Sequence, residues 1–474
     1  MVMNRVRATS YVRRTLSQPM NKRRATAALA QHPDGSVIAS GGDLQDSGGG
    51  ILGSVAAPNR QLHLGLLADG SSNSRLRDLG AEPIEEETEG GAADARMDFS
   101  LKEDVARLKE ICLTKTQLLL LFAPLGLWSR LGGLPTLCVF SFNFAALIPL
   151  SALLGAFTEE LSLHTGEITG GLLNATFGNA VEMIMSVQAL RIGLLEVVKG
   201  TLLGSILSNL LLVLGMSFFA GGLHHYLQKF NEKGATCSVT LLLLSCMGIV
   251  IPTVAAVDNG QHGTYNILMI SRITALLIGV TYCLFLFFQL YTHIGLFKDD
   301  DEDAEQWPMM SWEAATLMLF LVTSLVALHS ELLVSSIEEV VADYGLSESF
   351  IGVILLPIVG NAAEHLTAVT VAMKNKVDLA MGVAVGSSAQ IALFVFPFTV
   401  LVAWVMGQPL TMAVQPLSAV VMLLSVLVAM AVVQDGESNW LEGVMLMAAY
   451  LIISVVFWFD KPGPESAVSP ASSA

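Results

Sequence analysis

From Gln117 to Phe459 the sequence consists largely of long apolar segments, and this pattern restricts the fold more than any other feature. A helix needs about 20 apolar residues to cross a hydrocarbon layer ~30 Å thick. Because lipid cannot satisfy backbone hydrogen bonds, such segments are expected to be helices. Eleven segments have a suitable length, at approximately 116–133, 134–157, 168–190, 197–220, 237–256, 269–293, 312–335, 349–373, 378–406, 411–433 and 441–459. The pattern predicts an all-α integral membrane protein with about 11 transmembrane helices.

Composition agrees with a membrane protein and argues against other classes. The chain is 53% hydrophobic and 14% charged, with a mean hydropathy of +0.62, a combination that a water-soluble domain does not show. Its net charge of −16 argues against nucleic acid as a partner, because a phosphate backbone requires a basic surface. The five cysteines form no CxxC pair, and we interpret them as packing residues. We expect the lipid bilayer as a partner and no cofactor.

The N-terminal part of the chain differs from the rest. Residues 1–100 are rich in Gly, Ser and Ala, contain no apolar run that could cross a bilayer, and are predicted to be disordered. The first 24 residues carry seven basic residues and no acid, which fits a regulatory tail and also an organellar transit peptide. The remainder is expected to divide into a leading helix (101–133), a first repeat (134–296), an acidic cytosolic loop (297–311), a second repeat (312–460) and a short C-terminal tail (461–474).

Basic residues near the helix ends predict the orientation, because Lys and Arg are enriched in cytosolic loops. The orientation that places the basic residues before the first helix in the cytosol also places two later pairs there. These residues are Lys102, Arg107, Lys109, Lys115, Lys229, Lys233, Lys374 and Lys376.

A short motif occurs twice. The sequence GNAVE at 178–182 recurs as GNAAE at 360–364, an offset of 182 residues. The same offset continues into the next helix of each half, where Gly200, Gly204 and Ser205 correspond to Gly382, Gly386 and Ser387. Each repeat contains five predicted helices, and an odd number reverses the direction in the membrane. The sequence therefore predicts one leading helix followed by two inverted five-helix repeats.

The repeated motif places a carboxylate in the middle of an apolar helix, at Glu182 and at Glu364. Such a residue costs at least ~2.5–3.5 kcal/mol in a membrane helix and usually lines an ion path. Inverted broken helices would bring both carboxylates to one point near the membrane midplane. With amide oxygens from Asn179 and Asn361 they form an oxygen environment suited to a hard cation, and Ca²⁺ fits it well.

Further polar groups near the motifs are candidates for supporting roles. Gly178 and Gly360 would allow the backbone to bend and offer carbonyl oxygens. One helix further on, several side chains could orient the carboxylates or hold water, although small residues there also serve close helix packing. They are Ser205, Ser208, Ser387, Ser388 and Gln390.

His365, next to Glu364, fits a proton relay and equally a packing histidine. Interhelical hydrogen bonding is the alternative role for the two asparagines. Acidic residues at helix ends and in the loop after the sixth helix could capture cations from the cytosol, whereas plain solvation is the simpler interpretation. They are Glu159, Glu160, Asp299, Asp300, Asp301 and Glu302.

The two carboxylates also suggest how cation movement couples to protons. Without a cation, mutual repulsion and lost hydration disfavour two charged carboxylates in an apolar cleft, so protons replace the cation. A site that is both empty and charged is unfavourable in apolar surroundings. We therefore expect the protein to change conformation only when it is loaded, which is exchange rather than leakage.

The segments GNAVEMIMSVQAL (178–190) and GNAAEHLTAVTVAMKNKVDLAMGVAVGSSAQIALFVFP (360–397) resemble the two signature repeats of the vacuolar calcium/proton exchanger (CAX) family, within the cation/calcium exchanger superfamily. The resemblance covers roughly residues 100–460. It implies an eleven-helix fold in a vacuolar membrane, Glu182 and Glu364 as carriers of Ca²⁺ and H⁺, and supporting roles for Asn179, Asn361, Ser205, Ser208, Ser387 and Gln390. Val181 departs from the family, where many members have Thr, and this leaves finer selectivity open.

Other functions remain as alternatives. A sodium-driven or potassium-dependent sodium/calcium exchanger of the same superfamily would be expected to carry an Asp and more hydroxyls beside the second motif. A Mn²⁺/H⁺ exchanger would use similar oxygen ligands. A membrane-embedded protease would need a nucleophile or a metal cluster, and the sequence contains no HExxH motif or intramembrane Asp pair. A channel would differ in carrying one ion without counterflow of another.

Overall fold

The computed structural model describes residues 101–113, 115–259, 264–296 and 307–460. They belong to the second of two compact units in the chain, Gly91–Ala474. The predicted tail at 1–100, most of the acidic loop (297–306) and the C-terminal tail (461–474) lie outside the described residues. The cation-capture prediction for Asp299, Asp300, Asp301 and Glu302 therefore stays a prediction.

The described part begins with three short helical elements and continues into the first repeat. The leading elements are α2 (Leu101–Cys112), the 3₁₀ turn η2 (Lys115–Leu121) and α3 (Phe122–Leu131). The first repeat contains α4 (Thr136–Phe177), α5 (Ala180–Ile192), α6 (Leu195–Leu207), the π-helical η3 (Ser208–Val213), α7 (Leu214–Gly222), β1 (Gln228–Lys229), α8 (Glu232–Asn259), α9 (Thr264–Phe287), the π-helical η5 (Phe288–Thr292) and η6 (Ile294–Leu296). Helix α4 includes a sharp bend at Gly166, whose φ of 79° favours glycine.

The second repeat follows the same order, with more breaks in its helices. It contains α10 (Trp312–Ser335), α11 (Ile337–Tyr344), α12 (Glu348–Phe350), η7 (Ile351–Leu355), α13 (Leu356–Gly360), α14 (Ala362–Ala372), α15 (Val377–Met381), η8 (Gly382–Gly386), α16 (Ser387–Gln390), η9 (Ile391–Val395), α17 (Phe396–Val405), α18 (Pro416–Val433), β2 (Glu437–Ser438) and α19 (Trp440–Phe459). The two short strands pair antiparallel and connect the repeats at one end.

Local sequence explains several helix ends. Ser311 accepts a hydrogen bond from the Ala314 backbone at the start of α10. Asn439 and Glu442 form a reciprocal capping box at the start of α19. At the other end of a helix, Gly193 terminates α5 with a φ of 83°, a left-handed conformation that glycine adopts without strain. These signals set the boundaries between elements.

Eight helices of the described residues are long and apolar enough to cross a membrane, and the number rises to ten if each of two bent helix pairs is one span. The eleven predicted segments are all largely helical. Segment 168–190 is divided between the end of α4 and α5, and segment 411–433 begins its helix only at Pro416. The integral membrane, all-α fold is therefore confirmed.

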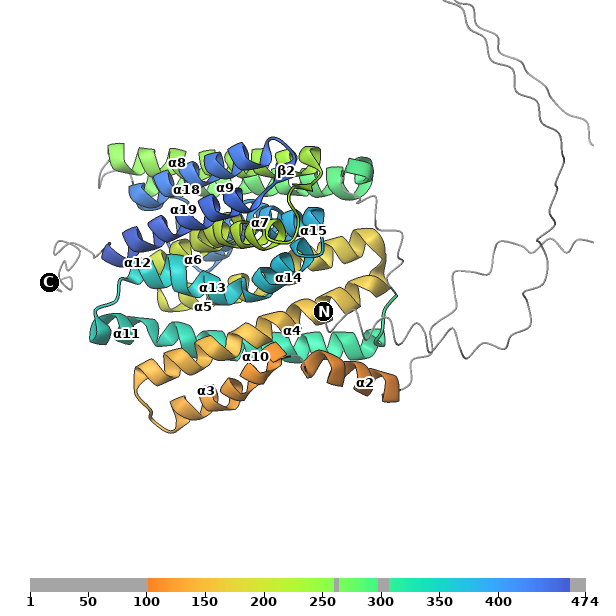
Figure 1. Cartoon of the computed structure of the whole chain (residues 1–474). Coiled ribbons are helices and arrows are strands. Elements are labelled where there is room, and N and C mark those ends of the chain that lie inside the picture. Colours follow the sequence, from red (N-terminus) through yellow and green to blue (C-terminus); the bar gives the residue numbers. More distant parts are fainter. Residues whose placement is uncertain (1–100, 114, 260–263, 297–306, 461–474) are drawn as a thin grey trace, which may run out of the picture. The chain divides into compact units, whose positions relative to one another are not determined.

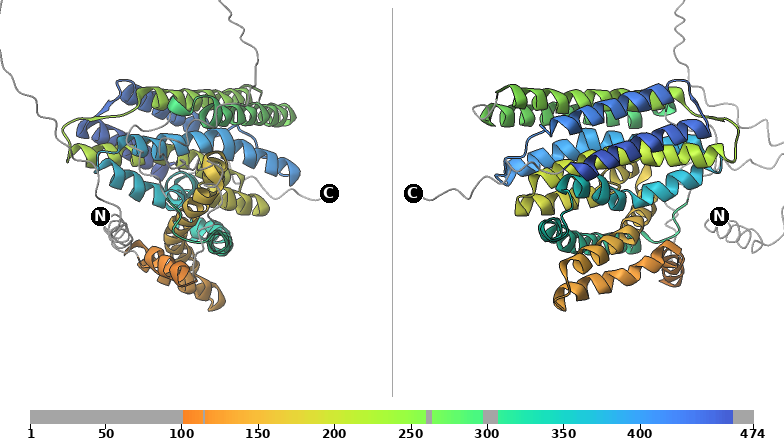
Figure 2. Two further views of the ribbon diagram at one scale, coloured as in Figure 1. Left: turned by 90° about the vertical axis from the view of Figure 1, so that its right-hand side faces the viewer. Right: turned by 60° about the vertical axis from the view of Figure 1, so that its left-hand side comes forward.

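The helices are arranged in layers that both sets of views show (Figures 1 and 2). Helices α3, α4 and α10 form one side, α8, α9 and α18 form the opposite side, and α5, α6, α13 and α14 lie between them. In the span Leu195–Gly222, 83% of the apolar stretch is buried inside the protein. In the span Tyr265–Thr292, only 17% of the corresponding stretch is buried. The α6–α7 span is thus central, and the α9 span presents apolar side chains outward, as contact with lipid requires.

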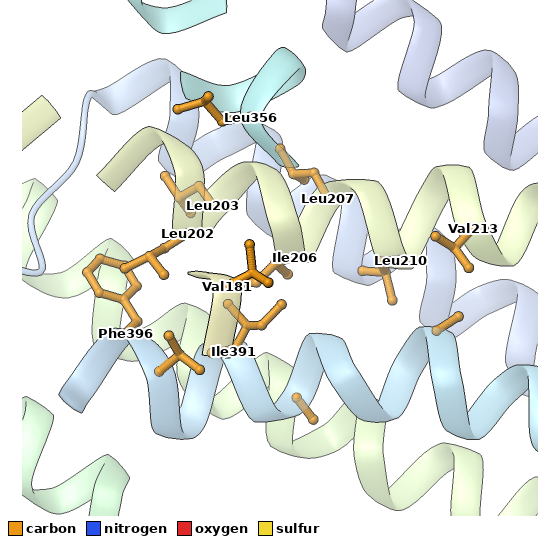
Figure 3. Packing of buried hydrophobic residues seen from close by; sticks show 14 of the residues in the cluster. Val181, Leu202, Leu203, Ile206, Leu207, Leu210, Val213, Leu356, Ile391 and Phe396 are labelled. Atoms are coloured by element: carbon orange, nitrogen blue, oxygen red, sulfur yellow. The ribbon is translucent and has the colours of Figure 1, made fainter. Parts of the chain in front are cut away.

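The two repeats share one apolar core. Leu202, Leu203 and Ile206 of α6 are almost completely buried, and they lie beside Ile391 and Phe396 of the second repeat (Figure 3). Burial of this kind fixes the central helices of one repeat against those of the other. The first carboxylate motif contributes to this core, since Val181 is 2% exposed and lies among these side chains (Figure 3).

Candidate functional site

Both GNA motifs interrupt a helix. Helix α4 gives way to α5 at the first motif, and α13 gives way to α14 at the second, where the chain bends by 58°. At each break the asparagine leaves the helical conformation, with φ −108° and ψ 18° at Asn179 and φ −90° and ψ 13° at Asn361. Glu182 and Glu364 follow in the first turn of the new helix. The partial positive charge of a helix N-terminus favours a carboxylate there.

The two carboxylates are enclosed and incompletely paired. Glu182 is 2% exposed, and Glu364 is half-buried. The Oε2 atom of each is buried and has no hydrogen-bond partner within the described residues. A buried, unpaired carboxylate oxygen is costly, so both atoms are suited to a cation or a proton.

The Glu182 carboxylate lies against the motif of the other repeat. A methyl group placed on Gly360 would be only 2.5 Å from Glu182 Oε1. Glycine at 360 is therefore required for the carboxylate to occupy its position. The contact brings the first carboxylate to the break that precedes the second, as the inverted repeat predicts.

The side chains of the two motif asparagines donate hydrogen bonds to the opposite repeat. Asn179 Nδ2 donates to Gln390 Oε1 at 2.8 Å, and Asn361 Nδ2 donates to the Ser205 carbonyl at 3.2 Å. Each amide nitrogen therefore connects its motif to the opposite repeat. The asparagines thus form the interhelical hydrogen bonds that the sequence left as one alternative, and their role as cation ligands stays a prediction.

His365 is held between the motif backbone and the first repeat. Its Nδ1 donates to the Asn361 carbonyl at 2.5 Å, so Nε2 of the neutral ring accepts from the Ser208 hydroxyl at 3.4 Å. The ring is therefore positioned by one residue from each repeat. This geometry fits a positioning role and leaves the proton-relay role a prediction.

The remaining predicted serines divide into two groups. Ser205 Oγ is buried without a partner within the described residues, as the carboxylate oxygens are. Ser387 donates to the Val383 carbonyl in its own helix, while Ser388 donates to the Ile206 carbonyl at 3.3 Å as well as to Ala384. Ser388 and Ile206 are separated by the repeat offset of 182 residues, so this contact lies where the two repeats cross.

One polar residue of the site was missed by sequence reasoning. Asn209 is fully buried, and neither its Oδ1 nor its Nδ2 has a hydrogen-bond partner within the described residues. It follows Ser208 at the start of the π-helical η3, and π-helical turns often occur at functional sites. Its only sequence signal is an amide inside the apolar run SNLLLVLG. Because η3 packs against α14, which carries Glu364, Asn209 is a further candidate for a cation ligand.

The described residues contain no cluster of three or more His, Cys, Asp or Glu side chains that could hold a metal ion. The site instead offers two carboxylates together with amide, hydroxyl and carbonyl oxygens. Ligands of this kind suit a hard cation that must also leave, rather than a permanently bound transition metal.

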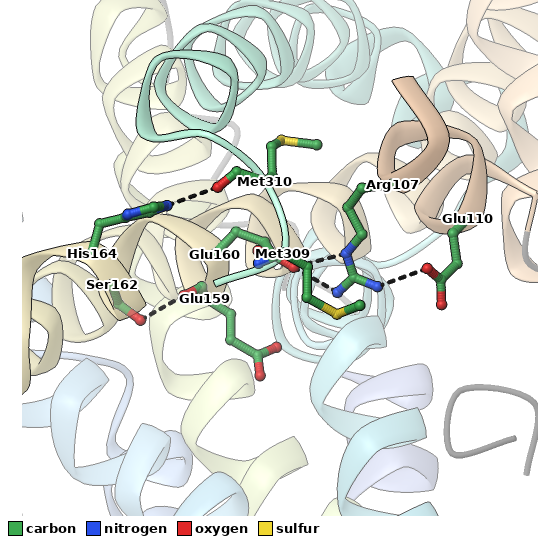
Figure 4. A network of polar contacts seen from close by, with 8 residues as sticks. All are labelled: Arg107, Glu110, Glu159, Glu160, Ser162, His164, Met309 and Met310. Carbon is green, nitrogen blue, oxygen red and sulfur yellow. Dashed lines mark hydrogen bonds and ion pairs between the residues drawn. The ribbon is translucent and has the colours of Figure 1, made fainter. Parts of the chain in front are cut away.

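The predicted capture residues at the end of the first long helix have different environments. Glu159 is exposed, whereas Glu160 is 3% exposed and accepts two hydrogen bonds from Arg107 of α2, at 2.8 and 2.6 Å (Figure 4). Glu160 also accepts from the Met309 backbone at 2.9 Å. In this conformation Glu160 therefore joins α2 and α4 to the segment before α10, and Glu159 is the more accessible carboxylate for a cation.

Comparison with known proteins identifies the family of the chain. The pattern of the family described as sodium/calcium exchanger protein matches residues 135–291 and 314–459. The chain is 42% identical over 361 residues to a Ca²⁺/H⁺ antiporter of Aphanothece halophytica, covering 73% of this chain and 97% of that protein. It is 40% identical over 373 residues to a vacuolar calcium ion transporter of Schizosaccharomyces pombe, covering 76% and 90% respectively.

A solved structure has the same fold. The chain is similar to native YfkE, with a TM-score of 0.64 and 38% identity, over 72% of this chain and 99% of that one. A further structure of the same antiporter is described as a Ca²⁺/H⁺ antiporter protein. Together with the two carboxylate motifs, these matches show that the chain belongs to the sodium/calcium exchanger protein family, within its calcium/proton exchanger (CAX) branch.

Proposed function

We propose that the protein is a secondary active antiporter that carries Ca²⁺ out of the cytosol in exchange for H⁺. Transport of this kind needs neither an enzymatic reaction nor a cofactor, and Ca²⁺ and H⁺ are its substrates. The relatives named as Ca²⁺/H⁺ antiporter and vacuolar calcium ion transporter support this assignment.

The observation that carries the proposal is the meeting of the two motifs. Glu182 reaches Gly360 of the opposite repeat, and both carboxylates keep a buried oxygen that has no hydrogen-bond partner among the residues that the structure describes. A divalent cation would neutralise both groups, and two protons would do the same. Because either load removes the charge that apolar surroundings disfavour, the loaded forms are the ones that change conformation readily.

The relatives, rather than the geometry of the site, indicate which membrane holds the protein. Relatives of this chain from Schizosaccharomyces pombe, Oryza sativa and Arabidopsis thaliana are named as vacuolar transporters or exchangers. We assign the protein to the membrane of a vacuole or another acidic organelle, where a proton gradient drives Ca²⁺ uptake.

The test is uptake of radioactive Ca²⁺ into proteoliposomes with an imposed pH gradient. Glu182→Gln and Glu364→Gln should each reduce uptake to the level of protein-free liposomes, because an amide can neither balance Ca²⁺ nor exchange its proton. Glu331→Gln is the control, since its side chain is 54% exposed on α10. Competing Mn²⁺, Na⁺ and K⁺ in the same assay measure selectivity. Full uptake in both site variants, or uptake driven by a Na⁺ gradient alone, contradicts the proposal.

A further inference from the structure

Arg272 is a positively charged residue inside a helix that mainly contacts lipid. It lies in α9, within the span Tyr265–Thr292, of whose apolar stretch only 17% is buried inside the protein. Helix α9 belongs to one outer side of the helix layers (Figure 1). A charged side chain is costly in such a place unless it reaches water or a partner of opposite charge.

The depth of Arg272 in the span places its guanidinium near the lipid headgroups. The 28 residues of the span are about 42 Å long and the hydrocarbon layer is ~30 Å thick, so about 6 Å of helix extends beyond the layer at each end. Arg272 follows Tyr265 by seven residues, or about 10 Å, so its backbone lies about 4 Å inside the apolar layer. An arginine can cover this distance with its apolar stem and hold its charge at the headgroup level.

Trp404 of α17 indicates the same depth independently. It is the residue before Val405, the last residue of α17, and it is 45% exposed. Tryptophan is enriched at the boundary between membrane and water, because its ring is partly apolar and partly polar. The Cζ atom of Arg272 lies over the Trp404 ring, 4.7 Å from the ring centroid. The two residues therefore form an interfacial pair that a cation–π contact stabilises.

The guanidinium of Arg272 retains its capacity for hydrogen bonding. Within the part of the chain that the structure describes, it takes part in no ion pair or hydrogen bond. By contrast, Arg107 is paired with Glu160, and Arg191 faces Glu331. A guanidinium offers five N–H donors in a planar fork that matches the oxygens of a phosphate group. The fork is therefore suited to a ligand that carries oxygen atoms and a negative charge.

The pair lies in the leaflet that faces away from the cytosol. The span Val377–Val405 begins directly after Lys374 and Lys376, which the charge pattern predicts for the cytosol. Trp404 is at the other end of this span, and thus at the opposite surface of the membrane. Since Arg272 contacts Trp404, it belongs to the same surface.

Helix α9 and the span that ends in α17 also meet near the carboxylate site. Tyr282 of α9 stacks on Phe394 of η9, with ring centroids 5.4 Å apart. Phe394 is four residues after Gln390, which accepts the hydrogen bond from Asn179. A ligand that contacts both Arg272 and Trp404 would therefore hold α9 against the span that supplies Gln390.

We propose that Arg272 and Trp404 bind the phosphate group of an anionic phospholipid in the leaflet that faces away from the cytosol. The guanidinium donates to the phosphate oxygens, Trp404 positions the guanidinium, and the acyl chains lie along the apolar outer face of α9. A lipid fits better than a soluble phosphate, because the Arg272 backbone lies inside a lipid-facing span. The site is separate from the two carboxylates, so the proposal does not depend on which ions the protein exchanges.

The experiment is native mass spectrometry of the full chain, freed of lipid in a neutral detergent. The protein is titrated with phosphatidylglycerol or with phosphatidylcholine of the same acyl chains. The wild type should bind the first phosphatidylglycerol more tightly than phosphatidylcholine, because only the anionic lipid has a net charge opposite to that of the guanidinium. Arg272→Gln should weaken binding of that phosphatidylglycerol at least about tenfold, since a charge-assisted hydrogen bond is lost. Its binding of phosphatidylcholine should be unchanged.

Arg191→Gln is the matched control. It removes the same charge, but Arg191 already faces the Glu331 carboxylate at 3.9 Å. This variant should bind phosphatidylglycerol as the wild type does. Wild-type affinity in Arg272→Gln, or equal losses in Arg272→Gln and Arg191→Gln, would overturn the proposal.

Trp404→Leu tests the second member of the pair, even if Arg272→Gln does not fold. Leucine keeps an apolar side chain but cannot make a cation–π contact, so the affinity for phosphatidylglycerol should fall about two- to fivefold. An unchanged affinity would contradict the role of Trp404.

Two further measurements separate a lipid from a soluble anion. Inorganic phosphate in excess should not displace phosphatidylglycerol, and displacement would assign the pair to a soluble anion and overturn the lipid site. Phosphatidylglycerol should also raise the melting temperature of the wild type and of Arg191→Gln, because a ligand that binds only the folded state stabilises it. The same increase in Arg272→Gln would place the stabilising lipid elsewhere and contradict the proposal.

Discussion

Gly360→Ala places a methyl group where the Glu182 carboxylate now lies. The methyl carbon would be 2.5 Å from Oε1, whereas real contacts of this kind are at least 3.0 Å and ordinarily 3.4–4 Å. The carboxylate must therefore retreat by at least 0.5 Å, and by 0.9 Å to reach an ordinary contact. The displaced atom is the free end of a flexible side chain. The free energy of unfolding should therefore fall by only about 1 kcal/mol, which is the cost of an off-rotamer side chain.

The effect on transport should be much larger than the effect on folding. A misplacement of ~1 Å at a reacting or binding group lowers the rate of the step that the group serves on the order of 100-fold. The KM for Ca²⁺ should therefore rise about 10- to 100-fold, while the melting temperature stays close to that of the wild type. Initial rates of Ca²⁺ uptake at several Ca²⁺ concentrations, under a fixed pH gradient, measure this change.

Gly155→Ala provides the matched control. Gly155 lies in α4, and a methyl group there would meet no atom within 4 Å. This variant should keep the wild-type KM. An unchanged KM in Gly360→Ala would mean that the Glu182 carboxylate does not need its present position against the second motif, and the reasoning on cross-repeat contact would be wrong.

Two further predictions concern contacts between distant parts of the chain. Arg107→Ala should lower the free energy of unfolding by about 3 kcal/mol, because it leaves the buried Glu160 carboxylate without its cation. The double variant with Glu160→Ala should recover part of this loss in thermal unfolding, and a double variant less stable than Arg107→Ala would contradict the ion pair's role. For Asn179 and Gln390, a double-mutant cycle to alanine should show a coupling of about 1 kcal/mol in Ca²⁺ binding, the usual contribution of a hydrogen bond. Strict additivity in calorimetric titrations would argue against that contact.

Some boundaries differed from expectation for local reasons. The predicted helix at 411–433 begins at Pro416, because proline suits the first turn of a helix and cannot continue one already begun. The first long helix continues past 157 and bends at Gly166. Glu160 was expected at a solvated helix end, and its burial depends on α2, which is distant in sequence.

Fold class and site motifs were readable from the sequence because they depend on local chemistry. Apolar segments must be helical in lipid, and a carboxylate within such a segment is costly enough to mark an ion path. The shared offset of 182 residues predicted that Glu182 and Glu364 meet across inverted repeats. None of these inferences required knowledge of the neighbours of a side chain.

Only the tertiary structure decided how equivalent residues differ. Gly204 and Gly386 have the same place in their repeats, yet one packs against Val353 and the other opens onto a cavity. Likewise, the buried amide of Asn209 has no partner within the described residues, although its surroundings in sequence suggest only packing. Which of two equivalent glycines is packed depends on contacts between residues far apart in the chain, and such contacts exist only in the folded molecule.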